Sequence, residues 1–145
     1  MKLLQLFRKN PEWLLYIAFT QAAISILGSL YYSEVLHLTP CLLCWYQRIA
    51  MYPQVLIIGA AIVKEDKNVM WYGLPLAIIG WIIALYHNLL MYNILESAET
   101  CSGGVSCTDI QVAYLGFITI PFLSLVAFTV VCGSLIAYQR TVSSA

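Results

Sequence analysis

The sequence predicts an all-α membrane protein, a four-transmembrane-helix bundle with two outer loops that carry cysteine pairs. Of its 145 residues, 61% are hydrophobic and only 10% are charged, which is too little polar surface for a soluble globular domain. Long uncharged runs are separated by short segments that hold nearly all the charges. Basic residues lie in alternate segments, and the remaining segments hold four of the five cysteines. We therefore expect a single membrane domain, residues 1–145.

The uncharged runs are long enough for four membrane spans, since a helix needs about 20 apolar residues to cross about 30 Å of hydrocarbon. The spans are expected at about residues 13–32, 41–63, 69–95 and 112–139. The first follows basic residues, as a cleavable signal would, but its run exceeds the roughly 7–15 residues of a signal core. No A-x-A cleavage site follows it, so we expect a retained anchor.

The second span determines where the first cysteine pair lies. Residues 49–63 alone would form roughly 22 Å of helix, which is too short to cross. A helix that starts near Cys41 is long enough, and Pro40 supports this start because proline is tolerated at the first turn. Cys41 and Cys44 then occupy the first turn at the outer interface, and Arg48 lies one turn further into the membrane.

The third and fourth spans contain few polar side chains. His87 interrupts the third, and Cys132 lies deep in the fourth, where a free cysteine commonly behaves as a small hydrophobe. Small residues spaced for close helix contact, and prolines of the kind that membrane helices tolerate, are expected to serve packing alone. They are Ala18, Ala22, Gly80, Ala84, Pro53, Pro75 and Pro121.

The basic residues predict the orientation of the bundle, because Lys and Arg are enriched in cytoplasmic loops. Of the seven, only Arg48 falls on the opposite side from the rest. The others are Lys2, Arg8, Lys9, Lys64, Lys67 and Arg140. We therefore expect a multi-pass protein of the cell membrane with cytoplasmic N- and C-termini. Both cysteine pairs would lie on the outer face, where disulfides form and persist.

The Cys41-x-x-Cys44 pair favours redox chemistry. A helix N-terminus carries partial positive charge, which stabilises a thiolate, and the thiolate is the reactive form of cysteine. Strained disulfides are also the exchangeable ones. Two alternatives remain: a passive staple, or half of a zinc site that Cys101, Cys107 or His37 would complete. The redox interpretation is preferred, and no metal is assigned.

The second pair, Cys101 and Cys107, is separated by a pliable loop with two glycines. Alone, this loop is as consistent with a structural clip as with redox chemistry, because it easily allows the Cα separation of about 5.5 Å that a disulfide prefers. Its position on the same face as Cys41 and Cys44 favours the redox role. We therefore predict four catalytic cysteines that act as a dithiol relay.

Three further side chains are candidates for binding an electron acceptor. Arg48 follows Cys44 by four residues, so both project from one helix face; its charge would stabilise a thiolate or an acceptor oxygen, or simply snorkel to headgroups. Trp45 would flank a flat ring, or serve as an interface anchor. His87 is expected at a depth similar to that of Arg48, which suggests a common pocket; its alternative role is an interhelical hydrogen bond.

The chain resembles the DsbB family of thiol:quinone oxidoreductases, in the shorter form called BdbC. The resemblance covers the four spans and both outer loops, and the P-C-x-x-C-W-Y-Q-R string is its most specific part. It is carried by Pro40-Cys41-Leu42-Leu43-Cys44-Trp45-Tyr46-Gln47-Arg48, Met51-Tyr52-Pro53, His87, Cys101, Cys107 and Gly116-Phe117-Ile118-Thr119-Ile120-Pro121. The second cysteine pair is much closer in sequence here than in the long-loop members.

The resemblance implies a four-helix bundle, a bound quinone (menaquinone or ubiquinone) and an extracytoplasmic thiol oxidase of thioredoxin fold, DsbA- or BdbD-like, as partner. Cys41 and Cys44 would face the quinone, with Cys44 next to its ring. Cys101 and Cys107 would take electrons from the partner. Arg48 and His87 match quinone-site positions.

The predicted function is therefore reoxidation of the partner's dithiol with transfer of the electrons to the membrane quinone pool, supporting disulfide formation in secreted proteins. One alternative is a non-catalytic four-span membrane protein with structural outer disulfides. Another is an enzyme like vitamin K epoxide reductase, in which we expect the C-x-x-C late in the bundle. Nucleic acid is excluded as a partner, because the net charge is zero and there is no basic stripe.

Overall fold

The computed structural model describes residues 10–92, 94, 113–114 and 118–143. Its helices are α2 (Glu12–Leu30), the π-helix η1 (Tyr31–Val35), α3 (Leu42–Lys64), α4 (Met70–Met91) and α5 (Ile120–Ser143). Two short strands, β1 (Ala113–Tyr114) and β2 (Ile118–Thr119), pair antiparallel before α5. The predicted α-helical class is thus confirmed, with the small hairpin as an addition to it.

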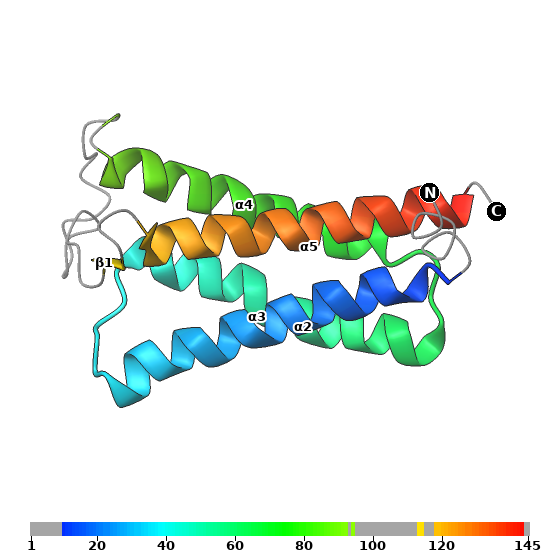
Figure 1. Ribbon diagram of the computed structural model, residues 1–145, viewed down its shortest axis with the longest axis horizontal. Coiled ribbons are helices and arrows are strands. Elements are labelled where there is room, and N and C mark those ends of the chain that lie inside the picture. Colours follow the sequence, from blue (N-terminus) through cyan, green and yellow to red (C-terminus); the bar gives the residue numbers. More distant parts are fainter. Residues whose placement is uncertain (1–9, 93, 95–112, 115–117, 144–145) are drawn as a thin grey trace.

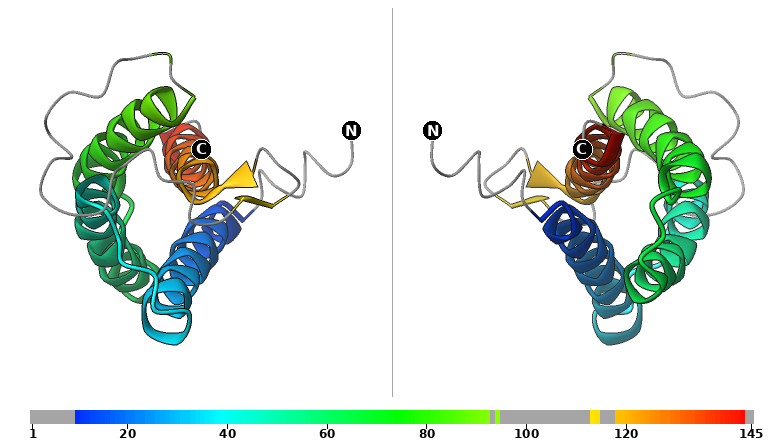
Figure 2. Two further views of the ribbon diagram at one scale, coloured as in Figure 1. Left: turned by 90° about the vertical axis from the view of Figure 1, so that its left-hand side faces the viewer. Right: turned by 90° about the vertical axis from the view of Figure 1, so that its right-hand side faces the viewer.

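The four long helices form an up-and-down bundle (Figure 1). Each packs against its two neighbours in the order α2, α3, α4, α5 and back to α2, whereas α3 and α5 barely touch across the diagonal. The end-on views show this ring (Figure 2). The start of α3, the end of α4 and the start of α5 meet at one end of the bundle. The start of α2, the α3–α4 turn and the end of α5 meet at the other (Figure 1).

Three of these segments are long and apolar enough to cross a membrane: α2 together with η1 (24 residues), α4 (22 residues) and α5 (24 residues). Helix α3, with 23 residues, is not among them. It carries Gln47, Arg48 and Gln54, which lower its hydropathy. Gln47 and Gln54 are buried inside the bundle, and the Gln54 amide donates to the Gly73 carbonyl of α4 over 2.8 Å. Whether α3 crosses the membrane stays a prediction.

Small residues let the helices approach closely, as the sequence predicted. Ala18, Ala22 and Ala84 are fully buried. Gly80 of α4 lies against Phe128 of α5, so closely that an added Cβ would meet the ring at 2.1 Å. Because Phe128 is itself fully buried, this contact fixes the spacing of α4 and α5.

Helix α5 begins at Ile120, later than the predicted start of the fourth span at residue 112. The β1–β2 hairpin occupies part of the intervening segment. Pro121 is the second residue of the helix, where its missing N–H costs no intrahelical bond. The Pro121 carbonyl accepts a 2.8 Å hydrogen bond from the buried Asn88 amide of α4. This bond holds the start of α5 against the cysteine-bearing end of the bundle.

Candidate redox site

The two cysteines of the C-x-x-C motif meet at the start of α3. Cys41 is the N-cap residue, with extended backbone (φ −71°, ψ 169°), and its carbonyl accepts the Trp45 N–H over 3.1 Å. Cys44 lies in the first turn, and the two Sγ atoms are 3.1 Å apart. Both thiols are free. Cys41 is buried and Cys44 is partly exposed, so the pair is poised to close into a disulfide at a helix N-terminus.

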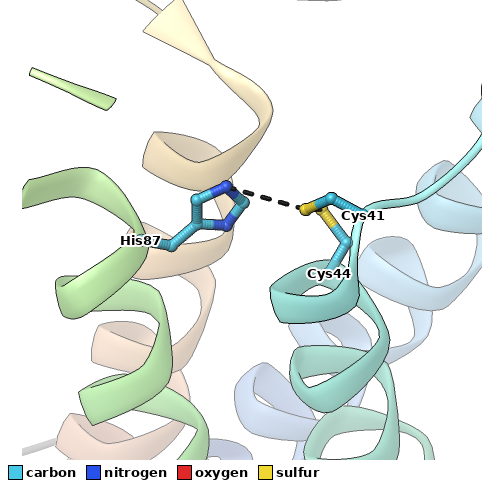
Figure 3. A group of neighbouring side chains, drawn as sticks. All are labelled: Cys41, Cys44 and His87. Carbon is cyan, nitrogen blue, oxygen red and sulfur yellow. Dashed lines mark hydrogen bonds between the residues drawn. The ribbon is translucent and has the colours of Figure 1, made fainter. Parts of the chain in front are cut away.

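His87 approaches this pair from α4 (Figure 3). Its Nε2 lies 3.8 Å from Cys41 Sγ, and its Nδ1 lies 3.1 Å from the Gln47 side-chain nitrogen. The ring is 1% exposed, which makes these fixed contacts of a buried imidazole. With the Gln47 NH₂ donating to Nδ1, the ring proton sits on Nε2 and faces the sulfur. His87 can therefore donate a hydrogen bond to a Cys41 thiolate.

Arg48 lies one turn beyond Cys44 and reaches across to α2. Its Nη2 donates to the Ser29 carbonyl over 3.0 Å. Its guanidinium carbon lies 5.4 Å from the centre of the Trp45 ring, within the range of a cation–π contact. Trp45 itself is about half exposed. The cation is thus held by a carbonyl dipole and an aromatic face.

Cys44 and Arg48 line a cavity of about 420 Å³ between α2, α3 and the start of α5. The wall is mainly apolar, and its polar side chains include Gln21, Ser25 and Gln47. Tyr52 also lines it, and the Tyr52 hydroxyl is buried with no hydrogen-bond partner in the part of the chain that the structure describes. A cavity of this size, apolar with a few polar groups, is typical of a small-molecule site.

The predicted site residues separate into two neighbouring groups. Cys44 and Arg48 share the cavity, whereas His87 and Trp45 are not among the described residues that line it. His87 instead contacts Cys41. Cys101 and Cys107 lie outside the described residues. Cys132, in α5, is partly buried and packs against the main hydrophobic core.

Gln47 and Tyr52 line the cavity, but the sequence analysis named them only within the strings that carry the resemblance and assigned them no role. Gln47 contacts His87 and also lines the cavity, so it connects the two groups. A signal for it existed: Cys44, Gln47, Arg48 and Met51 follow the i, i+3, i+4, i+7 spacing of one helix face. If this spacing had been applied from Cys44 onward, it would have predicted that Gln47 and Met51 lie on the same face of α3 as Arg48, which is the face that lines the cavity.

This fold and site define a class of protein, namely a membrane protein whose four-helix bundle holds a C-x-x-C dithiol at one end. The chain belongs to the DsbB family, since the family model described as "Disulfide bond formation protein DsbB" matches residues 11–138. The predicted resemblance is thereby confirmed. Membership implies a thiol–disulfide oxidoreductase with a role in disulfide bond formation.

Curated relatives agree with this assignment. The chain is 46% identical over 124 residues to "Disulfide bond formation protein C" of Bacillus subtilis, covering 85% of this chain and 90% of that protein. It is 46% identical over 121 residues to "Probable disulfide formation protein C 1" of Bacillus anthracis, covering 83% and 87%. It is 41% identical over 135 residues to "Probable disulfide formation protein C" of Halalkalibacterium halodurans, covering 91% and 98%. No solved structure matches the chain.

Proposed function

We propose that this protein is a membrane thiol:quinone oxidoreductase that reoxidises an extracytoplasmic thioredoxin-fold thiol oxidase. The observation that carries the proposal is the position of Cys44, which has Cys41 Sγ at 3.1 Å on one side and the 420 Å³ cavity on the other. A dithiol that opens onto an apolar cavity with a cation in its wall is suited to an electron acceptor that is itself apolar.

A quinone headgroup fits the chemistry of this cavity. Its flat ring suits apolar walls, and its two carbonyl oxygens need donors. Donors in the wall include Arg48, Gln47 and the Tyr52 hydroxyl, which has no hydrogen-bond partner among the described residues. Menaquinone or ubiquinone bound there would accept the two electrons and two protons that the Cys41/Cys44 dithiol loses when it becomes a disulfide.

The chain's own residues have separate tasks in this scheme. Arg48 stabilises negative charge at the Cys44 end of the cavity. His87 stabilises a Cys41 thiolate through Nε2–H, and Gln47 holds the imidazole in the tautomer that does so. His87 thus acts on the cysteine, which differs from the quinone-contacting role that the resemblance implied.

Electrons would enter through the second pair. The partner's thiolate attacks a Cys101–Cys107 disulfide, and its second thiol resolves the mixed disulfide, leaving the partner oxidised and this pair reduced. The Cys101/Cys107 dithiol then reduces a Cys41–Cys44 disulfide by the same exchange. Each step moves two electrons, and its direction follows the difference in reduction potential.

The proposal includes four membrane spans, cytoplasmic termini and both cysteine pairs on the outer face. It is supported by the bundle topology, in which the start of α3 lies at the end opposite the α3–α4 turn (Figure 1). Lys64 is the last residue of α3 and Lys67 lies within that turn, as expected of a cytoplasmic loop.

The deciding experiment is turnover by the purified full-length protein in detergent, with a reduced thioredoxin-fold thiol oxidase and added menaquinone or ubiquinone. We expect one quinone reduced for each partner disulfide formed. Partner oxidation that proceeds equally well without quinone, or none at all with it, would remove the quinone from the proposal while leaving the family assignment intact.

A further inference from the structure

Cys41, Cys44 and His87 also have the arrangement of a metal-binding site, a role that is separate from the proposed electron transfer. Each supplies one atom that can ligate a metal, and these three atoms lie within 4.8 Å of one another. Two thiolates and an imidazole are the ligands that Zn²⁺ prefers. The zinc alternative raised by the sequence needed Cys101, Cys107 or His37 as a further ligand. The structure supplies His87 in their place.

We propose that the reduced Cys41/Cys44 pair, together with His87, binds Zn²⁺ or a closely related thiophilic divalent ion, and that this ion inhibits the enzyme. The site exists only in the dithiol state, because a Cys41–Cys44 disulfide has no thiolate to offer. An ion bound there occupies both sulfurs and prevents the disulfide from forming. Metal and oxidation therefore compete for the same two atoms.

The distances suit such an ion after small side-chain movements. Tetrahedral zinc, with Zn–S of about 2.3 Å and Zn–N of about 2.0–2.1 Å, separates two sulfurs by roughly 3.8 Å and a sulfur from a nitrogen by roughly 3.5 Å. Here the two Sγ atoms are 3.1 Å apart, and His87 Nε2 is 3.8 Å from Cys41 Sγ. The sulfurs must separate by well under 1 Å, which a small rotation of the Cys44 side chain provides.

Gln47 is placed to support His87 as a ligand. A metal-bound imidazole commonly donates its other N–H to a neighbouring acceptor, which fixes the ring. The Gln47 amide lies 3.1 Å from Nδ1. Turning this amide by half a rotation presents its oxygen to Nδ1–H, and the Nε2 lone pair is then free for the ion. The same side chain can thus hold either tautomer of His87.

An ion can reach the site through the cavity. Cys41 and His87 are buried, at 7% and 1% exposed, but Cys44 forms part of the cavity wall. With three protein ligands, the fourth position is open on that side for water. A site with three ligands and an open position binds reversibly in the manner of catalytic rather than closed structural zinc.

The test uses the full-length chain in detergent with Cys101, Cys107 and Cys132 replaced by alanine, so that Cys41 and Cys44 are its only thiols. The reduced protein is titrated with Cd²⁺, and the ultraviolet charge-transfer absorbance of the Cd–thiolate bonds is followed. We expect saturation at one Cd²⁺ per chain, displacement by Zn²⁺, and no band from the oxidised protein. A band that does not saturate, or that saturates at another ratio, overturns the proposal.

The role of His87 is tested in the same background. His87→Ala should weaken Cd²⁺ binding at least tenfold, and His87→Asn should do the same while keeping a polar side chain against Gln47. His37→Ala is the matched control, because His37 is the other histidine of the chain, is exposed and lies outside the cluster. Unchanged affinity in the His87 variants, or an equal loss in His37→Ala, contradicts the assigned ligand set.

A second measurement needs no His87 variant. X-ray absorption of the Zn²⁺-bound parent protein should show two sulfur ligands near 2.3 Å and a nitrogen ligand near 2.0–2.1 Å. Sulfur alone, or nitrogen and oxygen alone, would overturn the site. Neither measurement involves quinone or the partner, so the outcome is independent of the proposed electron transfer.

Discussion

Arg48 connects α3 to α2 at the cavity wall, and its positive charge is the property that a substitution tests most directly. Arg48→Met removes the charge and its bond to the Ser29 carbonyl. A hydrogen bond that involves a charged group is worth about 1.5–3 kcal/mol, so kcat/KM for quinone should fall by roughly ten- to a hundredfold. Steady-state kinetics with varied quinone concentration, and separately with varied partner concentration, will separate an effect on the quinone from an effect on the partner.

Arg48→Lys provides the control for charge. It should restore the activity only in part, because an ammonium cannot reproduce the planar fork that reaches a carbonyl and stacks on Trp45. KM for the partner should stay close to wild type in both variants. Unchanged quinone kinetics in Arg48→Met would leave Arg48 as an anchor between helices and remove it from the acceptor site.

Gln47 is expected to act by positioning His87. Gln47→Leu removes the contact to Nδ1 and should slow turnover about fivefold, the equivalent of a hydrogen bond of about 1 kcal/mol. Gln47→Glu keeps the size of the native side chain, but an ionised carboxylate offers Nδ1 only acceptors, so the ring proton moves to Nδ1 and Nε2 no longer donates to Cys41. Turnover should therefore fall at least as far in Gln47→Glu as in Gln47→Leu. Wild-type turnover in Gln47→Glu would mean that Gln47 serves packing alone.

At the scale of residues, the sequence predicted which side chains share a helix face but not which ones meet across the bundle. Cys41, Cys44 and Arg48 follow from helical spacing, which fixes the face on which they lie. The sequence predicted a depth for His87 similar to that of Arg48, but depth does not determine which neighbour a side chain meets. Its contact with Cys41 depends on how α4 is rotated against α3, and no pattern within either helix specifies that rotation.

At the scale of elements, the contact between Gly80 and Phe128 should control the packing of α4 on α5. In Gly80→Ala the new methyl group would lie 2.1 Å from the Phe128 ring, and overpacking of this kind costs typically 1–3 kcal/mol. Thermal unfolding in detergent should show a lower Tm. Gly133→Ala in α5 is the matched control: within the described part of the chain, nothing lies within 4 Å of its added Cβ, so the Tm should rise or stay the same.

A double variant identifies the cause. If the clash with the ring is responsible, adding Phe128→Leu to Gly80→Ala should cost less than the sum of the two single changes. Strict additivity would show that Gly80→Ala acts through something other than Phe128.

The element boundaries were predictable where the chain carries an explicit signal. Pro40 and the cysteines marked the start of α3 within one residue, since the helix begins at Leu42. The start of α5 was placed too early because apolar residues before Ile120 read equally well as helix or strand over a short run. Pro121 was the available signal, as proline favours the first turn of a helix.

At the scale of the whole molecule, the cysteines should divide into four that are required and one that is not. Alanine at Cys41, Cys44, Cys101 or Cys107 should abolish partner oxidation. Cys132→Ala should leave turnover near normal, because Cys132 belongs to the core of the bundle, away from the C-x-x-C pair. In Cys107→Ala, the freed Cys101 should form a mixed disulfide with the partner, visible on a non-reducing gel. An active Cys101/Cys107 double variant would make that pair a structural clip.

The order of α2, α3 and α4 follows from apolar runs with short connections, because short loops make sequential helices antiparallel neighbours. The closure of α5 onto α2 does not follow from any local pattern. Ala18 and Ala22 of α2 are buried in one hydrophobic core with Ala127, Phe128 and Val131 of α5, which are far away in the sequence. The ring in Figure 2 is thus the part of the fold that required the structure.

The orientation of this ring in the membrane gives the last prediction. Glu34 and Asn68 are both exposed, and they lie at opposite ends of the bundle, Glu34 after α2 and Asn68 before α4. Glu34→Cys and Asn68→Cys, each in a chain without other cysteines, keep all seven basic residues and therefore the charge asymmetry.

Cells stripped of their wall should be treated with a membrane-impermeant thiol reagent. Glu34→Cys should react in intact cells, and Asn68→Cys only after permeabilisation. The reverse pattern would put the C-x-x-C pair on the cytoplasmic side, where thiols are kept reduced, and would contradict a role in oxidising secreted proteins.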